Sequence, residues 1–222
     1  LDLVEQMIRV AFGEKLSFGQ ADIKRNGWSM ECRINADDPY RNFLPSTGRL
    51  VRYQPPEEVD GVRVDTGVYE GGEIPMYYDS MIAKLIVHGK DRMDAITKMR
   101  AALNKFVIRG IHSNIPFQSA LMQHPRFISG DFNTGFIAEE FPHGFRASDV
   151  KAVDSGLMDA LATAIHRRYL DRAAGIYGQL EGHEVKIPHE FVVASGESGK
   201  MDYVSTSVEE TARGYEVTVG GQ

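Results

Sequence analysis

WSMECRIN, at residues 28–35, alternates strictly between two kinds of side chain. In an extended chain the apolar residues, from Trp28 to Ile34, lie on one face, and Glu31, Arg33 and Asn35 lie on the other. A proline four residues beyond this stretch cannot donate to a strand ladder, so the pattern ends there. The stretch therefore predicts a β-strand with one face in a core and one polar face.

The sequence around this strand predicts an α+β domain. Further strands are expected at 49–53, 61–69 and 80–88, because apolar and β-branched residues alternate or cluster there between turn residues. Helices are expected at 1–11, from a cap at Asp91 to Gly110, at 114–124 and at 134–141, where apolar residues recur at helical spacing. We predict an antiparallel sheet with helices packed on it.

A second domain is expected to follow a turn at Pro142-His143-Gly144. We place the first domain at 1–142 and the second at 145–222. The second begins with a long helix, 154–174, in which Leu157, Leu161, Ile165 and Tyr169 recur every four residues, and it continues with strands. Its last strand runs into a Gly-Gly turn that predicts a returning strand, so both ends of the chain look cut from something longer.

Composition excludes several classes of protein. The 222 residues are 42% hydrophobic and 25% charged, which is typical of a globular protein. A net charge of −6 argues against nucleic-acid binding, and no apolar run approaches the roughly 20 residues of a membrane helix. Cys32 is the single cysteine, so no intramolecular disulfide is possible. Phosphate-loop, dinucleotide, zinc-protease and nucleophile-elbow motifs are absent, and His183 and His189 alone do not make a zinc site.

Two groups of polar residues are candidates for chemistry. The first is Arg33 with its neighbour Glu31, which is either a solvated strand face or a guanidinium aimed at an anion and braced by a carboxylate. The second is Tyr77-Tyr78-Asp79 before the strand at 80–88, which is either a structural turn or the rim of a cleft. The residues alone leave both alternatives open.

Five motifs in order resemble the biotin carboxylase family. ECRINADDP at 31–39 is similar to its E-C-R-I-N-A-E-D-P signature, with Asp37 in place of a glutamate. Further motifs that resemble the family follow in order: FLPSTG at 43–48, GVRVD at 61–65, YYDSMIAKL at 77–85 and IRGIHSNI at 108–115. The resemblance covers residues 1–142 and implies the C-terminal lobe of an ATP-grasp biotin carboxylase, preceded by the last helix of the ATP-grasp region.

Further segments narrow the resemblance to the α subunits of propionyl-CoA carboxylases. These are Gly27-Trp28, FISGDFNT at 127–134 and FPHGF at 141–145. In that family the next segment is the BT domain, a long helix wrapped by an antiparallel β-barrel, which links the subunit to carboxyltransferase β subunits. The resemblance implies the same for 145–222, and it leaves a methylcrotonyl-CoA, other acyl-CoA or pyruvate carboxylase, or a non-biotin ATP-grasp ligase, as alternatives.

The resemblance also implies site residues. Arg33 corresponds to the arginine that binds biotin and stabilises the enolate formed on its ureido oxygen. We expect Glu31, Tyr78 and Asp79 to support it, with Asp79 or Glu31 holding the guanidinium. ATP, Mg²⁺ and bicarbonate are implied, but the ATP-grasp lysines, the magnesium ligands and the biotin-carrying A-M-K-M motif are absent from this segment, which contains no metal site of its own and is expected to be inactive alone.

The implied partners are the carboxyltransferase β subunit, reached through the BT domain, and the biotin carrier domain of the same subunit. No nucleic acid and no membrane is expected. A bacterial protein of this kind is expected in the cytoplasm, and a eukaryotic one in the mitochondrial matrix. The acyl-CoA is not fixed by this segment, because the β subunit binds it.

Overall fold

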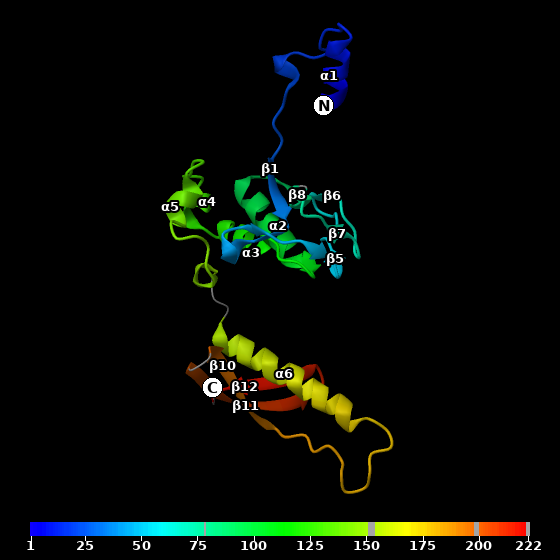
Figure 1. The fold of residues 1–222 in the computed structure, drawn as a ribbon, viewed down its shortest axis with the longest axis vertical. Coiled ribbons are helices and arrows are strands. Elements are labelled where there is room, and N and C mark those ends of the chain that lie inside the picture. The colour runs from blue at the N-terminus through cyan, green and yellow to red at the C-terminus, as the bar shows by residue number, and fades with distance from the viewer. Residues whose placement is uncertain (78, 151–153, 198–199, 221–222) are drawn as a thin grey trace. The chain divides into compact units, whose positions relative to one another are not determined.

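The computed structural model describes residues 1–77, 79–150, 154–197 and 200–220. The chain forms two compact units, Leu1–Val150 and Lys151–Gln222 (Figure 1). The segment after the expected turn at 142–144 still packs on the first unit, because the buried Phe145 stacks on Tyr40 and meets the edge of Phe117.

The main sheet of the first unit has three antiparallel strands in the order β1-β8-β6. They are β1 (Trp28–Asn35), β8 (Met81–Gly89) and β6 (Val62–Thr66). β1 has the predicted bounds, β8 lies within one residue of its predicted range, and β6 is shorter than predicted. The predicted burial is confirmed in the second half of β1, where Cys32 and Ile34 are buried while Glu31 and Arg33 are exposed. It is wrong for Trp28, which the alternation places on the core face but which is 46% exposed. The expected fold class of an antiparallel sheet with packed helices is thus confirmed.

Three two-stranded ladders lie beside the main sheet. They pair β2 (Asp37–Asp38) with β3 (Leu44–Pro45), β4 (Gly48–Arg49) with β7 (Glu73–Ile74), and β5 (Arg52–Gln54) with β9 (Val107–Arg109). The prediction of one strand at 49–53 is wrong. Leu50 is fully buried and exchanges backbone hydrogen bonds with the Gly71-Gly72 turn, so β4 and β5 have different partners.

The helices of the first unit are α1 (Leu3–Ala11), α2 (Arg92–Lys105), α3 (Ile115–Leu121), α4 (Pro125–Ser129) and α5 (Phe136–Glu140), with short 3₁₀ turns at Gln20–Asp22, Pro39–Arg41 and Ala147–Asp149. Asp91 caps α2 as predicted, because its carboxylate accepts a hydrogen bond from the Asp94 N–H at 2.9 Å. The helix ends at Lys105 and not near Gly110, since the chain turns into β9. Gly110, at φ +99°, instead lets the Arg49 carbonyl approach where a Cβ would clash.

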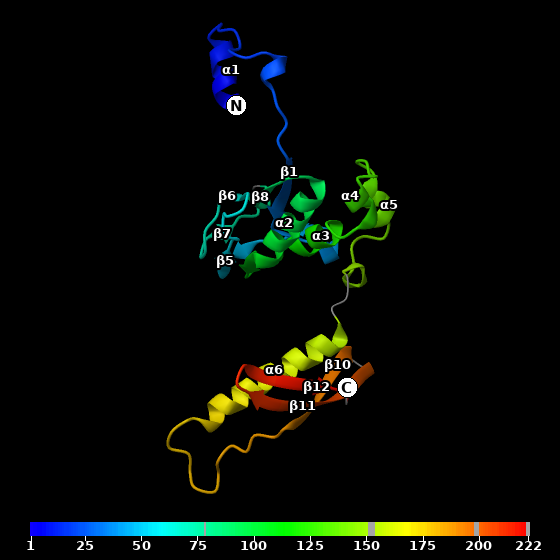
Figure 2. The same cartoon turned by 180° about the vertical axis from the view of Figure 1, so that it is seen from behind.

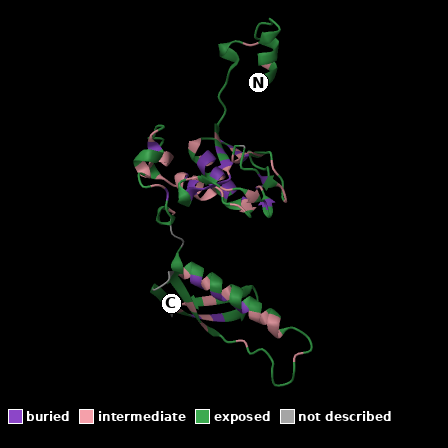
Figure 3. Ribbon diagram, viewed as in Figure 1, coloured by how far each residue is buried: buried purple, intermediate pink, exposed green. Residues whose placement is uncertain are grey.

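The core of the first unit lies between the main sheet and α2 (Figure 3). Ile34 of β1, Leu85 and Val87 of β8, and Met99 and Leu103 of α2 are buried almost completely. α1, by contrast, buries none of its residues, although Leu3, Met7 and Val10 form an apolar stripe. The stability of this unit therefore depends on the contact between β8 and α2.

The second unit consists of α6 (Ser155–Ala174) beside the antiparallel strands β10 (Glu190–Glu197), β11 (Lys200–Thr211) and β12 (Gly214–Val219). α6 runs along the sheet in both views (Figures 1 and 2). The predicted helix is confirmed, with Asp154 as its cap. Over residues 154–197 and 200–220 the sheet has two open edges and does not close, so the expected β-barrel is not formed by the described residues.

The face that α6 turns to the sheet is polar. Thr163 is buried and lies 2.8 Å from the Thr206 hydroxyl of β11. Arg167 is also buried; its Nε donates to Asp171, which accepts a second hydrogen bond from the Tyr215 hydroxyl of β12 at 2.5 Å. The Tyr215 bond, with Arg167, holds the pKa of Asp171 below its usual value. The apolar residues that predicted this helix, from Leu157 to Tyr169, are exposed.

Replacing Leu85 by alanine tests the position of the core. Leu85 is fully buried, so Leu85→Ala should lower the free energy of unfolding of the first unit by about 2–5 kcal/mol through lost burial and a residual cavity. Chemical denaturation measures this. Val51→Ala is the control, because Val51 is 68% exposed and should change stability by less than about 0.5 kcal/mol. Equal effects of the two substitutions would show that the core is elsewhere.

Candidate functional site

Arg33 lies on the polar face of β1, and the strand ladder fixes its neighbours. It is opposite Lys84 of β8, which is in turn opposite Asp65 of β6. The Arg33 side chain is 56% exposed. Its sequence neighbours Cys32 and Ile34 are buried in the core. The alternation along β1 thus places the guanidinium at an accessible surface between two core residues.

Among the described residues, the Arg33 guanidinium has two side-chain partners. One Nη lies 3.3 Å from a carboxylate oxygen of Asp79, and Nε donates to the sulfur of Met81 at 3.2 Å. The other oxygen of Asp79 accepts a hydrogen bond from the Met81 N–H at 3.2 Å. Arg33, Asp79 and Met81 therefore form a closed set of contacts at the start of β8.

A β-bulge brings Met81 to this face. The register of β1 and β8 shifts after Ile34, which is opposite Ala83, so that Asn35 is opposite Met81 and Ile82 has no partner. Ile82 and Ala83 are both buried, and Met81 lies on the face of Arg33. Bulges commonly re-aim side chains in this way. The sequence analysis missed Met81, and the only signal was the break in alternation at Ile82-Ala83.

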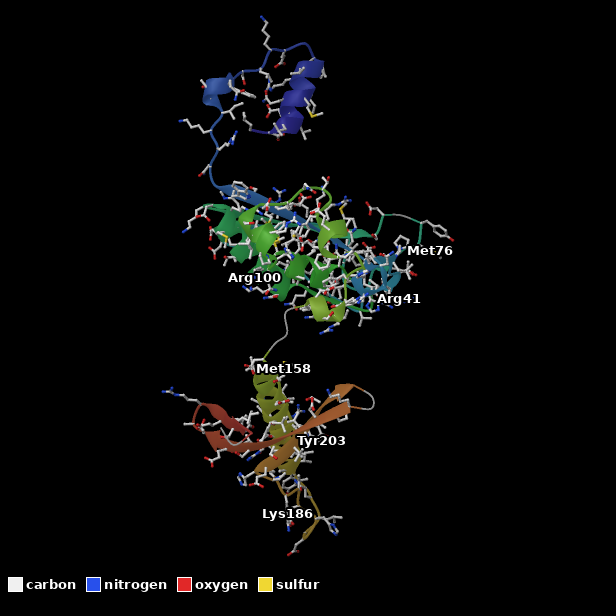
Figure 4. All side chains as sticks on the ribbon, turned by 90° about the vertical axis from the view of Figure 1, so that its left-hand side faces the viewer. Arg41, Met76, Arg100, Met158, Lys186 and Tyr203 are labelled. Atoms are coloured by element: carbon white, nitrogen blue, oxygen red, sulfur yellow. The ribbon has the colours of Figure 1, made fainter. Side chains whose placement is uncertain are left out.

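The other predicted site residues, Glu31 and Tyr77, form no hydrogen bond or ion pair with the Arg33 guanidinium in the described part of the chain. Among the described residues, Arg33 forms its carboxylate pair with Asp79 and not with Glu31, which is exposed on β1. Tyr78 lies outside the described residues. Tyr77 is exposed, and the loop with Met76 extends outward from the unit (Figure 4).

A shallow hollow of about 370 Å³ is lined by residues of β8 and of β6 with the turn after it, and Arg33 is not part of this lining. Met81, whose sulfur contacts Arg33, is part of its lining, and Lys84 and Asp65 supply charged groups.

Over the described ranges no three His, Cys, Asp or Glu side chains gather as metal ligands, and no helix there is long and apolar enough to span a bilayer.

Cys32, the neighbour of Arg33, is not a reactive group. Burial, with a smaller contribution from the Glu31 charge, raises the pKa of its thiol to about 12. The thiol therefore stays protonated at neutral pH and packs as a small apolar side chain.

Comparison with known families gives two matches. Residues 31–139 match the family model of the biotin carboxylase C-terminal domain, and residues 158–222 match that of the propionyl-coenzyme A carboxylase BT domain. Each of the two segments is thus similar to one domain family, and each match covers less than half of the chain. The predicted resemblance is confirmed, and Arg33 falls within the segment that matches the biotin carboxylase C-terminal domain.

Curated relatives match most of this chain. The propionyl-CoA carboxylase alpha chain of Ruegeria pomeroyi is 50% identical over 212 residues, which cover 87% of this chain and 31% of that protein. The mitochondrial alpha chain of Homo sapiens is 44% identical over 174 residues, covering 78% of this chain and 24% of that protein. The chain therefore spans about a third or less of the relatives that it matches.

A solved structure supports the fold of the biotin carboxylase C-terminal domain. The biotin carboxylase domain of Hydrogenobacter thermophilus 2-oxoglutarate carboxylase, solved with ADP, magnesium and bicarbonate, has a TM-score of 0.61 and 41% identity. The match covers 69% of this chain and 32% of that one.

Proposed function

We propose that this chain is part of an ATP- and biotin-dependent acyl-CoA carboxylase subunit that converts propionyl-CoA to methylmalonyl-CoA. The observation that carries the proposal is the succession of a biotin carboxylase C-terminal domain and a BT domain in one chain. The names of both relatives favour propionyl-CoA over methylcrotonyl-CoA or pyruvate. They also argue against a non-biotin ligase.

In the proposed reaction, Arg33 is the catalytic group of this segment. Biotin, when bound, supplies a ureido group whose nitrogen accepts the carboxyl group and whose oxygen carries the negative charge. The Arg33 guanidinium fits this oxygen, because it is permanently charged and remains more than half exposed after pairing with Asp79 and Met81. Its role is that of a pre-positioned donor for a developing oxyanion.

Asp79 and Met81 position the guanidinium in this proposal. Asp79 alone is a weak restraint, because exposed ion pairs contribute only about 0–1 kcal/mol and its carboxylate is 63% exposed. The Met81 N–H also donates a hydrogen bond to the second carboxylate oxygen of Asp79. This bond restricts the rotation of the Asp79 side chain away from Arg33. We include Tyr78 and Glu31 as supporting residues on the family resemblance alone.

We further propose that ATP, Mg²⁺ and bicarbonate bind mainly to parts of the protein outside these 222 residues. The related Hydrogenobacter domain holds magnesium, ADP and bicarbonate, whereas the described residues offer no carboxylate cluster for a metal. The segment alone should then be inactive. A bacterial protein would act in the cytoplasm and a eukaryotic one in the mitochondrial matrix, and the human relative is named as mitochondrial.

The second unit serves assembly in this proposal. Its three-stranded sheet has open edges, and α6 exposes Leu157, Leu161, Ile165 and Tyr169. Further strands that close a barrel around α6 would cover such a stripe. We propose that the completed BT domain docks the carboxyltransferase β subunit, and that the biotin carrier domain of the same subunit delivers biotin to Arg33.

Removing Arg33 tests the catalytic role. In the full-length subunit, Arg33→Ala should lower biotin-dependent ATP hydrolysis by roughly 10²–10³-fold, the usual loss for one oxyanion donor. Steady-state kinetics measure this. Arg52→Ala is the matched control, because Arg52 forms an exposed ion pair with Glu70 at a similar distance, 3.4 Å, in another ladder. Unaltered hydrolysis and biotin affinity in Arg33→Ala would reject the catalytic role.

Removing Asp79 tests the positioning role. Asp79→Ala should lower the turnover number about tenfold, which corresponds to ~1.4 kcal/mol of lost transition-state stabilisation, while Arg33 itself is retained. Glu31→Gln removes the alternative carboxylate and should leave turnover within about twofold, since Arg33 pairs with Asp79. A larger loss in Glu31→Gln than in Asp79→Ala would assign the role to Glu31.

Replacing the BT segment tests the assembly role. A full-length subunit in which the BT domain is exchanged for a Gly-Ser linker should no longer co-purify with the carboxyltransferase β subunit. It should keep biotin-dependent ATP hydrolysis, because Arg33 lies in the other domain. Unchanged co-purification would show that the β subunit binds elsewhere.

A further inference from the structure

The strand that carries Arg33 is an edge strand. In the order β1-β8-β6, the described residues pair only one side of β1 with another strand of its sheet. The bulge opposite Ile34 and Asn35 also interrupts the regular ladder on the paired side. β1 is therefore least supported by its sheet beside Arg33, where the proposed chemistry needs a fixed backbone.

Asn114 occupies the open edge at this point. Its side-chain Nδ2 donates to the Arg33 carbonyl at 3.0 Å, and its Oδ1 accepts from the Asn35 N–H at 2.9 Å. Its backbone N–H donates to the Asn35 carbonyl at 3.1 Å. These groups of Asn114 satisfy the same backbone groups that a neighbouring strand would satisfy.

The local sequence leaves the amide of Asn114 available for this contact. Asn114 is the N-cap of α3, a position where asparagine usually accepts a hydrogen bond from the helix, yet its side chain makes no such bond. Pro116 in the first turn has no N–H to be capped. Asn114 is buried to 94%, given its 6% exposure, so its amide would be costly to leave unpaired.

We propose that Asn114 is a positioning residue for Arg33, a side-chain clamp that replaces a strand at the open edge of β1. The proposal rests on the proposed function of Arg33. The guanidinium partners, Asp79 and Met81, restrain the tip of the side chain, whereas Asn114 fixes the backbone on both sides of Ile34. Gln118, one turn along α3, adds a longer contact to the Arg33 carbonyl at 3.5 Å.

A double-mutant cycle in the full-length subunit tests the clamp. Asn114→Ser removes the paired amide but keeps a good helix cap, and Asn114→Asp keeps the acceptor for Asn35 while losing the donor to Arg33. Either substitution should lower the turnover number for biotin carboxylation about tenfold, because small displacements of a catalytic group cost up to 10²-fold. The KM for ATP should stay within about twofold.

The decisive comparison is made in the Arg33→Ala background. If Asn114 acts through Arg33, Asn114→Ser should change the residual turnover there by less than about twofold. The same tenfold loss in both backgrounds, or a loss explained by a lower folded fraction in thermal unfolding, would overturn the proposal. Asn114→Asp answers the same question if the serine variant does not fold.

Two controls distinguish the proposed role of Asn114 from the proposed catalytic role of Arg33. Asn133→Ser removes an asparagine whose side chain accepts a hydrogen bond from the Gly135 N–H within its own turn. This variant should leave turnover unchanged. Full activity of Arg33→Ala would reject the proposed catalytic role of Arg33. A normal loss in Arg33→Ala with full activity in both Asn114 variants would reject only the clamp.

Discussion

The pairing of β1 with β8 is the constraint on which the rest of the first unit depends. Side chains alternate along a strand, so one register places Cys32 and Ile34 in the core and Arg33 at the surface. A shift of one residue would bury the guanidinium and expose Ile34. Because burying an unpaired charge is far costlier than any gain in pairing, the hydrophobic pattern that folds the domain also fixes the candidate catalytic group.

The strength of the contacts around Arg33 is uneven, and this decides which of them position it. The ion pair with Asp79 is exposed on both sides and screened by water, so it orients the guanidinium without fixing the strand. The contacts of Asn114 with the backbone are partly buried and satisfy groups that have no strand partner among the described residues. The neutral, partly buried hydrogen bonds of Asn114 therefore hold the backbone at Arg33, whereas the charge pair with Asp79 orients the tip of its side chain.

Sequence predicted the elements whose periodicity is strong and local. β1, β8, α2 and α6 follow from alternation, helical spacing and a capping aspartate, and Arg33 and Asp79 followed from motifs that resemble a family. The strand expected at 49–53 failed because Leu50 bonds to a distant turn. Met81 and Asn114 could not be predicted, since one depends on a bulge and the other on contacts between residues about 80 positions apart.

The burial pattern of the second unit also depends on partners distant in sequence. In its helix α6 the polar face is buried and the apolar face is exposed. α6 turns Thr163 and Arg167 toward its sheet and leaves Leu157 and Ile165 exposed. The polar face is tolerable because Thr206 and Tyr215 supply hydrogen bonds, although one Nη of Arg167 is buried with no partner among the described residues. A helix of this kind gains little from one sheet alone. Its exposed apolar stripe is stabilised only when a second surface covers it, which is what a closed barrel would supply and an isolated three-stranded sheet does not.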